Sequence, residues 1–480
     1  MLEEELVRLV NKITSEKCEK QHIELKNASG GAPTKLYNTL SSFSNQIGGG
    51  IIIFGIDEST GYKVTGVYDA QDIQKKVMEQ SLQMNPVIRP LFTAARVADK
   101  MVVSAEISEC DIYEKPCFYK GAGRLRGSYI RIGDSDQPMT EYEIYSYEAF
   151  KRRTNDELRT IDRATLEDFG SDKATEYLIK LRRQKSNLIN LEDKRIFETQ
   201  GIMQGGLPTL TGLLLLGGYP QEFFPQLSVT AVVVQGKEMG DLGHDGERFI
   251  DNKRIEGTIS EMLEGTLAFV RRNMKVKTII NEEGIRADKP EYPIKAIREI
   301  VLNALIHRDY SIHTDRSPIR LVMYEDRLEL ENPGGLYGRI TIDDLGKTAA
   351  DTRNPYLAGA LEILIDSENR FSGIPTVISE LKKVGMPAPV FIDRRGAFKV
   401  VFYKNAVVGD EDVDIIREII NYCITPRSRE ELANRFGFST ASYFKKTYIS
   451  PLIEDGRIKM TIPEKPKSKF QKYYSENIRA

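Results

Sequence analysis

The chain has 480 residues, and at roughly 150 residues per domain this length predicts about three domains. Hydrophobic residues make up 40% and charged residues 29%, which are ordinary globular values and exclude a largely disordered chain. The net charge of −2 gives no overall attraction to nucleic acid, so any such binding must depend on local clusters of charge.

Cysteine and histidine are scarce, and this limits the possible metal sites. Four scattered cysteines show no CxxC spacing, which excludes a disulfide scaffold and a zinc site and indicates a reducing, cytoplasmic environment. Four histidines are too few for a His-rich centre, so a metal here would be held by carboxylates. No apolar run reaches the roughly 18 residues that span a bilayer, and the acidic start is no signal peptide. We therefore expect a soluble protein with no membrane contact.

Residues 1–150 are predicted to form an α+β domain. After an opening helix, the residues IIIFGIDE form an apolar strand that ends in carboxylates, and GYKVTGV returns as a hairpin. Helical spacing follows over Asp72–Met84. MVVSAEIS and GSYIRIG are further strands, and Gly121–Gly127 is expected to be a basic loop between them.

Carboxylates gather around the first two strands of this domain. If 22–26 is a strand, Glu24 and Lys26 share a face, because side chains alternate along a strand. Glu19 precedes that strand, and Asp57 and Glu58 follow the apolar one. Such oxygens can converge on Mg²⁺ or Mn²⁺, which could activate water against a phosphodiester. The alternative is a solvated strand face followed by ordinary turn residues.

Three segments then carry a family resemblance. EKQHIELK, SSFSNQIGGGIIIFGIDEST and KPCFYKGAGRLRGSYIRIGD resemble the Schlafen-type AlbA-like domain. The resemblance implies that Glu19, Glu24 and the pair Asp57–Glu58 fall on the three-carboxylate active site of the nuclease members, beside Lys26. Many bacterial members carry similar carboxylates and are described only as nucleic-acid-binding regulators. Family members often have two aspartates after the strand, where this chain has Asp57–Glu58.

Cations interleaved with aromatic residues form the nucleic-acid candidate in this domain. Cations would meet phosphates while aromatic rings stack on bases. The rings are Phe118, Tyr119 and Tyr129, and the cations are Lys115, Lys120, Arg124, Arg126 and Arg131. A simple charged loop is the competing interpretation. The earlier glycines 48–50 lack a following Lys-Ser/Thr, so they are no Walker loop and are expected to serve close backbone packing.

Residues 151–205 are predicted to be a charged helical connector, and residues 206–405 a second domain. LTGLLLLGG and VTAVVVQG are predicted strands, and Arg254–Met274 is a predicted amphipathic helix. PIKAIREIVLNALIHRDY is a second helix, followed by strands at IRLVMYEDRLELENP and AFKVVFYKN. On the second helix, Glu299 and Asn303 are four residues apart and share a face. A carboxylate and an amide so placed suit Mg²⁺ and a triphosphate.

REIVLNALIHRDY, ENPGGL, RNPYLA and SGIP together resemble a divergent GHKL-type ATPase domain, which is an α/β sandwich. This version often lies downstream of Schlafen-type AlbA-like domains and is labelled helicase-like, although the chain has no helicase motifs. The resemblance implies ATP with Mg²⁺. The residues that it implies are Glu299 and Asn303 for the metal, Glu331 and Asn332 for adenine, and Gly334, Gly335 and Gly373 for the glycine turns. The usual Asp-x-Gly-x-Gly box stands here as Glu-Asn-Pro-Gly-Gly.

Residues 410–480 are predicted to form a winged helix. A helix over Val413–Cys423 precedes a helix capped by Ser428 and Glu431, then a third helix and a basic hairpin. In that order the third helix enters the major groove and the wing touches phosphate. The candidate contacts are Ser442, Lys445, Lys446, Lys467 and Lys469. A protein-docking or dimerisation unit is the alternative.

Three functions follow from these features. The first, narrowly preferred, is an ATP-binding, nucleic-acid-binding regulator, a transcriptional regulator that contacts DNA through the winged helix. The alternative is a Schlafen-like metal-dependent endoribonuclease that acts on structured RNA such as tRNA, is gated by the ATP module and serves in phage defence. The third is an assembly protein in which nucleotide drives oligomerisation, and we expect a homo-oligomer. ATP hydrolysis and the choice between DNA and RNA stay open.

Overall fold

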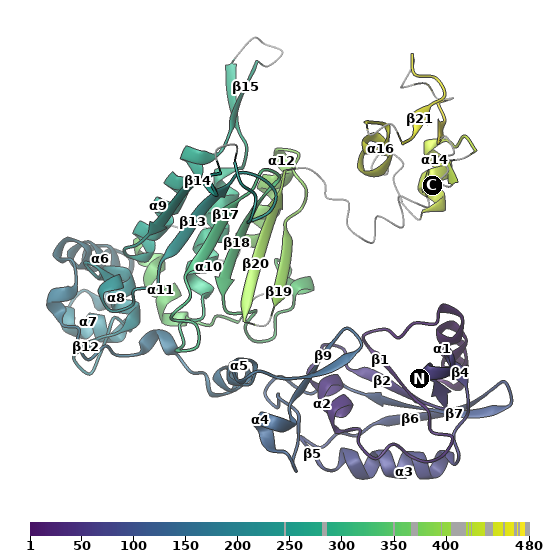
Figure 1. Cartoon of the computed structure of the whole chain (residues 1–480). Helices are drawn as coiled ribbons and strands as arrows, with labels where there is room; N and C mark the ends of the chain where they lie inside the picture. The colour runs from purple at the N-terminus through teal and green to yellow at the C-terminus, as the bar shows by residue number, and fades with distance from the viewer. Residues whose placement is uncertain are drawn as a thin grey trace.

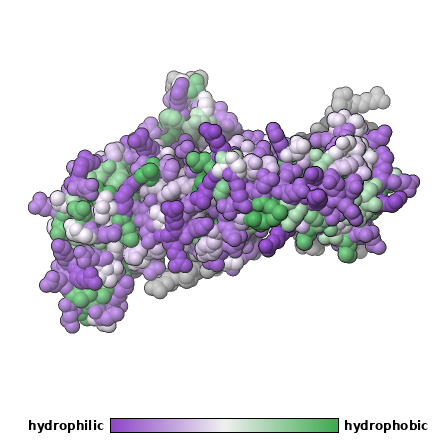
Figure 2. Space-filling view, turned by 90° about the horizontal axis from the view of Figure 1, so that it is seen from below, coloured by the Kyte–Doolittle hydropathy of each residue, from purple (hydrophilic) through white to green (hydrophobic). Residues whose placement is uncertain are grey.

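The computed structural model places two sheet-containing units and a smaller C-terminal unit along the chain (Figure 1). It describes residues 1–243, 246–280, 286–348, 351–365, 373–394, 396–404, 419–420, 422–423, 425–436, 445–454, 457–464, 468 and 471–475. Hydrophilic residues predominate on the face seen in Figure 2, and apolar residues form small separate patches. Within the described ranges, no helix has both the length and the apolar character needed to cross a membrane.

The first unit is a four-stranded sheet with helices on both faces. The strand order is β1-β2-β7-β6, with β1 parallel to β2 and the other pairs antiparallel. Its main elements are α1 (Glu3–Glu16), β1 (Ile23–Lys26), α2 (Tyr37–Asn45), β2 (Gly50–Phe54), α3 (Ala70–Ser81), β6 (Leu91–Val97) and β7 (Lys100–Ile107). Leu6 of α1 packs with Ile53 on one face, and Phe43 of α2 packs with Ile52 on the other. Because both faces are covered, β2 is apolar throughout.

Short elements at the edges of this unit carry the candidate residues. The predicted hairpin is confirmed, because β3 pairs antiparallel with β4. The predicted loop 121–127 is instead a short helix from residue 123, and β9 and β10 form a second hairpin. The bounds are β3 (Ile56–Asp57), β4 (Lys63–Val64), β5 (Met84–Asn85), β8 (Phe118–Tyr119), α4 (Gly123–Gly127), β9 (Tyr129–Ile132), β10 (Ser135–Pro138) and α5 (Glu141–Arg152). Gly49 has φ +70°, and a Cβ there would lie 2.1 Å from the Ile107 carbonyl oxygen, which agrees with close backbone packing at the glycine turn.

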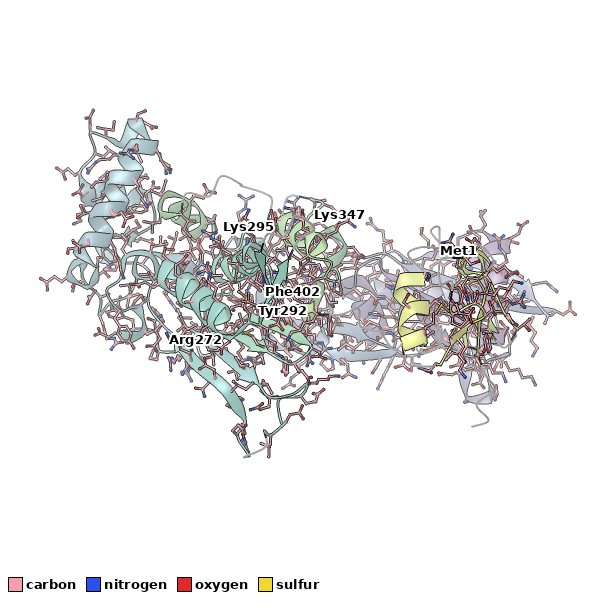
Figure 3. The ribbon with its side chains drawn as sticks, turned by 90° about the horizontal axis from the view of Figure 1, so that it is seen from above. Met1, Arg272, Tyr292, Lys295, Lys347 and Phe402 are labelled. Atoms are coloured by element: carbon pink, nitrogen blue, oxygen red, sulfur yellow. The ribbon has the colours of Figure 1, made fainter. Side chains whose placement is uncertain are left out.

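The second unit is a six-stranded sheet in the order β14-β13-β17-β18-β20-β19, with its main helices packed on one face. Only β13 and β17 pair in parallel. The strands are β13 (Val229–Val234), β14 (Phe249–Ile255), β17 (Ile319–Met323), β18 (Arg327–Pro333), β19 (Val390–Arg394) and β20 (Ala397–Tyr403). The helices are α9 (Ile259–Asn273), α10 (Ile294–His307), α11 (Pro355–Leu364) and α12 (Gly373–Lys383). Tyr292 and Phe402, labelled in Figure 3, are fully buried in this unit.

Two predictions about elements of this unit are wrong. LTGLLLLGG is a helix, α8 (Leu210–Leu216), and not a strand. All seven residues are buried, so no periodicity separated the two possibilities, whereas the Thr209 side chain accepts from the Gly212 amide and caps a helix. The helix predicted from Arg254 begins only at Ile259, after a capping box between Thr258 and Glu261, and the residues before it complete β14.

The helical segment before residue 206 belongs to the same core as the second sheet. One hydrophobic cluster runs from Ala164 to Phe402 and includes Leu181 of α6 (Ser171–Gln184) and Ile196 of α7 (Asp193–Thr199). The expected boundary between connector and second domain is therefore not a boundary of the core.

The C-terminal unit has a hydrophobic cluster of its own, which includes Ile419, Leu432 and Tyr473. Its described elements are α14 (Arg429–Arg435), α16 (Ser450–Glu454), β21 (Lys459–Met460) and β22 (Tyr473–Tyr474). The predicted cap is confirmed, because the Ser428 amide donates to Glu431 at 2.7 Å and the Glu431 amide to the Ser428 hydroxyl at 3.2 Å. The winged helix as a whole stays a prediction.

Candidate functional sites

The carboxylates at the start of the first sheet surround a buried arginine. Arg131 of β9 is 1% exposed in its side chain. Its Nη2 lies 2.7 Å from Glu24 Oε2 and its Nη1 lies 2.9 Å from Asp136 Oδ1. Lys26 forms an ion pair with the other oxygen of Glu24. Two cations thus face the carboxylates of Glu24 and Asp136, and the cluster is compensated by side chains of the unit itself.

Glu19 lies at the edge of this cluster. Its Oε1 accepts a hydrogen bond of 2.9 Å from the Leu25 amide, and its Oε2 is 3.9 Å from Arg131 Nη2. Burial is the main cause that raises the pKa of Glu19 to about 7, and the neighbouring Glu24 and Glu58 add to the effect. The sequence prediction that Glu19 and Glu24 approach one another agrees with this geometry.

Asp57 and Glu58 have separate partners. Asp57 accepts from the Ser59 amide and hydroxyl and from the Asn27 amide, and the Ser59 hydroxyl is the main cause that lowers the pKa of Asp57. Glu58 is exposed and accepts from Tyr62 at 3.3 Å. This arrangement matches the turn-residue interpretation, with Asp57 capping the short helix that follows.

The carboxylates therefore do not fit a Mg²⁺ or Mn²⁺ ion in this arrangement. A divalent ion needs several free oxygens, and here both oxygens of Glu24 are paired with Arg131 and Lys26, while Asp57 accepts from Ser59 and Asn27. Among the described residues, no group of three or more His, Cys, Asp or Glu side chains is placed to hold a metal.

The raised pKa of Glu19 predicts a pH dependence of stability. The folded unit holds this proton more tightly than the unfolded chain, so its stability falls as pH rises from about 4.5 to about 7. Glu19→Gln keeps an acceptor for the Leu25 amide and removes the titration. We expect the variant to be more stable than the parent above pH 7 by on the order of 2–3 kcal/mol. Hydrogen exchange of β1 at pH 5 and pH 8, corrected for intrinsic rates, measures this, with the exposed Glu16→Gln as control. The prediction is contradicted if the change in stability between pH 5 and pH 8 is the same in Glu19→Gln as in the parent.

The basic aromatic segment divides into buried and exposed cations. Lys115 is buried and its Nζ lies 2.6 Å from Glu109 Oε1, and Arg131 is buried as described. These two are held inside the unit, whereas Lys120, Arg124 and Arg126 are exposed. Lys120 donates to the Leu82 carbonyl, Arg124 pairs with Glu148 of α5 at 2.6 Å, and Arg126 has no ion-pair partner in the described part of the chain. Phe118 lies 5.6 Å below the Arg124 guanidinium, and Tyr119 stacks on Tyr37 at 3.8 Å.

The second candidate site lies on the helix-covered face of the second sheet. Glu299 and Asn303 share a face of α10, and the start of α12 lies against both. A Cβ on Gly373 would be 2.9 Å from Asn303 Nδ2 and 3.4 Å from Glu299 Oε2. Burial raises the pKa of Glu299. The structure therefore brings together the two residues that the resemblance assigned to the metal and one of its glycine-turn residues, Gly373.

Strand alternation separates Glu331 from Asn332. Asn332 is buried beside the helix-facing residues of β18, and its Oδ1 has no hydrogen-bond partner within the described residues. Glu331 faces the opposite side of the sheet, where it pairs with Arg320 and lies 3.5 Å from Lys399. Only one of the two predicted adenine residues thus faces the side of Glu299 and Asn303. An unpaired buried acceptor is the group that an exocyclic amino group, such as that of adenine, would satisfy.

The glycine turn after β18 is built around a buried ion pair that was not predicted. Gly334 has φ +102°, and a Cβ there would be 2.3 Å from Arg353 Nη1. Arg353 donates to the Gly335 carbonyl at 3.1 Å and lies 3.2 Å from Asp309 Oδ2. A Cβ on Gly335 would be 2.7 Å from Asp393 Oδ1. The turn therefore has no room for larger residues, and its shape depends on Arg353.

A tyrosine of α5, Tyr142, contacts the ion pair of Asp309 and Arg353. The Tyr142 hydroxyl donates to Asp309 Oδ2 at 2.6 Å, and its ring lies against Gly396. Burial raises the pKa of Asp309, but Arg353 and the hydrogen bonds outweigh it and hold the pKa below its ordinary value. Asp309 and Arg353 lie within two of the motifs that carry the resemblance, REIVLNALIHRDY and RNPYLA, although no role was predicted for them. Tyr142 carried no such signal, because its partner is 167 residues away.

Most C-terminal contact candidates are not described. Ser442, Lys467 and Lys469 lie outside the described residues, as does the side chain of Lys446. Lys445 is half-buried, and its Nζ lies 5.9 Å from the Tyr473 ring centroid.

Comparisons with known families agree with both resemblances. Residues 19–140 match the family "Schlafen, AlbA_2", and residues 316–402 match the HATPase family described as "Putative ATP-dependent DNA helicase recG C-terminal". The chain thus contains a Schlafen AlbA-like domain and a HATPase-like domain in a mixed α+β fold, which indicates a nucleic-acid-binding, ATP-related protein. Residues 412–474 match "Filamentation induced by cAMP protein Fic-like, C-terminal domain".

Solved structures add only distant likenesses. A Corynebacterium diphtheriae protein is 18% identical over 95% of this chain and 93% of its own, with a TM-score of 0.39. The N-terminal domain of a RecG-related protein from Nitrosomonas europaea is 27% identical over 28% of this chain and 92% of its own, with a TM-score of 0.23. A Fic family protein from Desulfovibrio desulfuricans is 13% identical over 69% of this chain and 89% of its own, with a TM-score of 0.13. No curated protein matches the chain.

Proposed function

We propose that this chain is a regulator that binds ATP with Mg²⁺ in its HATPase-like domain and nucleic acid through its AlbA domain and C-terminal unit, as a transcriptional regulator does. The observation that carries the proposal is the hydrogen bond from Tyr142 to Asp309. It joins α5, which leaves the AlbA domain, to the ion pair that shapes the glycine turn of the candidate nucleotide site. A nucleotide that repositions Arg353 would act directly on α5.

The residues of the second unit fit ATP. Asn332 offers its unpaired buried oxygen to the adenine amino group, and the Gly334–Gly335 turn lets the backbone approach the nucleotide. Glu299 and Asn303 would hold Mg²⁺ and the phosphates, beside the start of α12. Bound Mg²⁺ would neutralise phosphate charge.

Binding is favoured over cleavage by the state of the N-terminal carboxylates. Glu24 is held by Arg131 and Lys26, so it is not free to coordinate an ion or activate water. The endoribonuclease alternative would require Arg131 to leave a site in which its side chain is 1% exposed. We therefore prefer the regulator.

The test uses a pair of neighbouring residues on opposite faces of β18. Asn332→Leu removes the unpaired oxygen, and we expect ATP affinity, measured by calorimetry with Mg²⁺, to fall at least tenfold. Stability should not fall, because an unsatisfied buried polar group costs about 1–3 kcal/mol. Glu331→Gln is the matched control and should keep ATP affinity within twofold. If Asn332→Leu binds ATP as tightly as the parent does, Asn332 does not contact the adenine and the assignment of the site is wrong.

The same variants test regulation. We expect saturating ATP to change the affinity of the parent for duplex DNA by about 5–150-fold, the usual range of allosteric coupling. Asn332→Leu should bind DNA without this response. DNA affinity that is identical with and without ATP would overturn the regulator, and tRNA cleavage with Mn²⁺ that is lost in Glu19→Ala, Glu24→Ala would favour the nuclease.

A further inference from the structure

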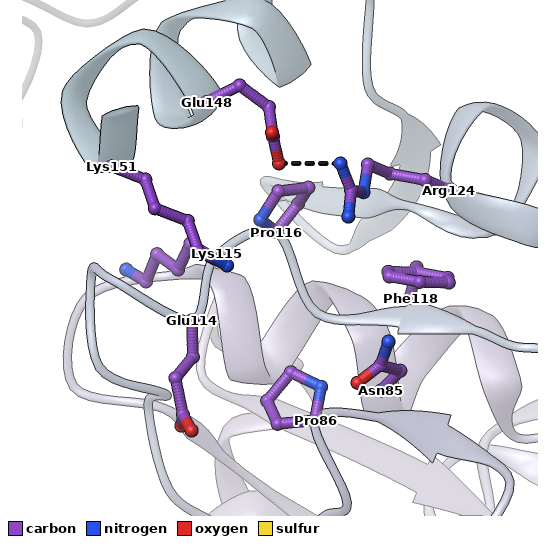
Figure 4. A pocket seen from close by; sticks show the side chains of 9 residues that line it. All are labelled: Asn85, Pro86, Glu114, Lys115, Pro116, Phe118, Arg124, Glu148 and Lys151. Atoms are coloured by element: carbon purple, nitrogen blue, oxygen red, sulfur yellow. Dashed lines mark hydrogen bonds and ion pairs between the residues drawn. The ribbon is translucent and has the colours of Figure 1, made fainter. Parts of the chain in front are cut away.

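A cavity of about 140 Å³ lies where the AlbA domain meets α5 (Figure 4). Pro86 and Pro116 form apolar walls with the ring of Phe118, and Asn85, Arg124 and Lys151 contribute polar groups. Binding sites of this kind combine apolar walls with a few polar groups, but drug-sized ligands need roughly 300–1,000 Å³. The cavity therefore suits one small planar group.

Phe118 and Arg124 supply flat surfaces in this cavity. The guanidinium of Arg124 lies 5.6 Å from the Phe118 ring centroid and is fixed by Glu148 Oε1 at 2.6 Å. Aromatic rings and guanidinium planes are the surfaces on which unpaired bases stack. Asn85 is exposed and makes no side-chain hydrogen bond among the described residues, so its amide can donate to and accept from the edge of a base.

Charge around the cavity is suited to a single phosphate. Lys151 is exposed and has no ion-pair partner in the described part of the chain, whereas Lys115 is neutralised by Glu109. Two carboxylates line the cavity: Glu148 is paired with Arg124, and Glu114 lies, like Lys151, on the side of the opening away from Arg124 (Figure 4). A base beside Phe118 would thus leave its phosphate on the side of the opening where Lys151 supplies a cation (Figure 4).

We propose that this cavity binds one unpaired nucleotide of a single-stranded nucleic acid, with the base on Phe118 and the phosphate on Lys151. The proposal rests on nucleic-acid binding by the AlbA domain and names the form of nucleic acid that it takes. Because Glu148 and Lys151 belong to α5, the bound nucleotide also contacts the helix that reaches the second unit.

The full chain and a fluorescein-labelled single-stranded 12-mer test the proposal by anisotropy. Phe118→Leu keeps an apolar side chain and should weaken binding about tenfold or more, as expected when one base loses its stacking surface. Lys151→Gln should weaken binding severalfold and reduce the salt slope by about 1. Lys75→Gln, an exposed lysine of α3 outside the cavity, is the matched control and should change neither.

A photocrosslink gives a readout that does not depend on affinity. An oligonucleotide with one 4-thiouracil base should crosslink to the peptide that contains Phe118. The proposal is overturned if Phe118→Leu and Lys151→Gln both bind the 12-mer as tightly as the parent does. It is also overturned if the two substitutions weaken binding of a duplex of the same length by the same factor. Binding of free uridine monophosphate that Phe118→Leu abolishes, with the 12-mer unaffected, also overturns it in favour of a free nucleotide. If the protein binds duplex DNA in an ATP-dependent way but does not bind single strands, the cavity proposal is wrong and the proposed regulatory function is unaffected.

Discussion

Replacing Arg131 with methionine is expected to destabilise the AlbA domain by about 3–5 kcal/mol, the usual effect of removing one partner of a buried ion pair. Arg131 holds Glu24 and Asp136 at 2.7 and 2.9 Å and donates to the Ile23 carbonyl at 3.3 Å. Without it, two carboxylates of 12% and 14% exposure remain with Lys26 as the nearby cation. The methionine fills much of the space, so lost charge compensation dominates the effect.

Hydrogen exchange of β1 and β2 peptides measures this loss, and an effect of this size speeds exchange by about two to four orders of magnitude. Arg126→Met is the control, because Arg126 is exposed. The triple variant Arg131→Met, Glu24→Gln, Asp136→Asn should regain part of the stability, since both carboxylate partners of Arg131 are then neutral and only the partly exposed Lys26 loses a partner. If Arg131→Met loses less than about 1 kcal/mol of stability, the ion pairs of Arg131 behave as surface pairs and the prediction is wrong.

The second large effect is expected for Asp309→Ala. Asp309 is 5% exposed in its side chain and accepts from Tyr142 and from the Ser311 amide while pairing with Arg353. Its removal leaves the guanidinium of Arg353, 8% exposed, without its carboxylate, and we expect the second unit to lose about 3–5 kcal/mol. ATP affinity should fall as well, because Arg353 would no longer hold the glycine turn at the Gly335 carbonyl.

Urea unfolding followed by circular dichroism measures this loss, because the chain has no tryptophan whose fluorescence could report unfolding. Asp315→Asn is the matched control, because Asp315 pairs with Arg159 at 3.6 Å with side chains 22% and 28% exposed, and should change stability by about 0–1 kcal/mol. Tyr142→Phe separates stability from coupling. It leaves the ion pair in place and should abolish the effect of ATP on DNA affinity. A Tyr142→Phe variant with the full ATP response would show that the domains communicate by another route.

Local pattern was enough for the main elements and for the two resemblances. The apolar run of β2, the spacing of α10 and the strands β17, β18 and β20 all carry their own periodicity, because a strand or helix buries a face that its own residues define. The same holds for the pairing of Glu299 with Asn303, which depends only on the helical repeat. Pattern failed for α8, where every residue is buried and both periods fit equally well.

The sequence by itself determined the AlbA-like and HATPase-like resemblances and which residue types the candidate sites offer. Only the tertiary structure decided what those residues contact. Arg131 was expected to face nucleic acid and instead lies between Glu24 and Asp136, and Glu331 faces away from Asn332 and α10. Tyr142 reaches Asp309 across 167 residues. The physical reason is that charge, burial and hydrogen bonding depend on neighbours brought together from distant parts of the chain, whereas periodicity depends on neighbours along it.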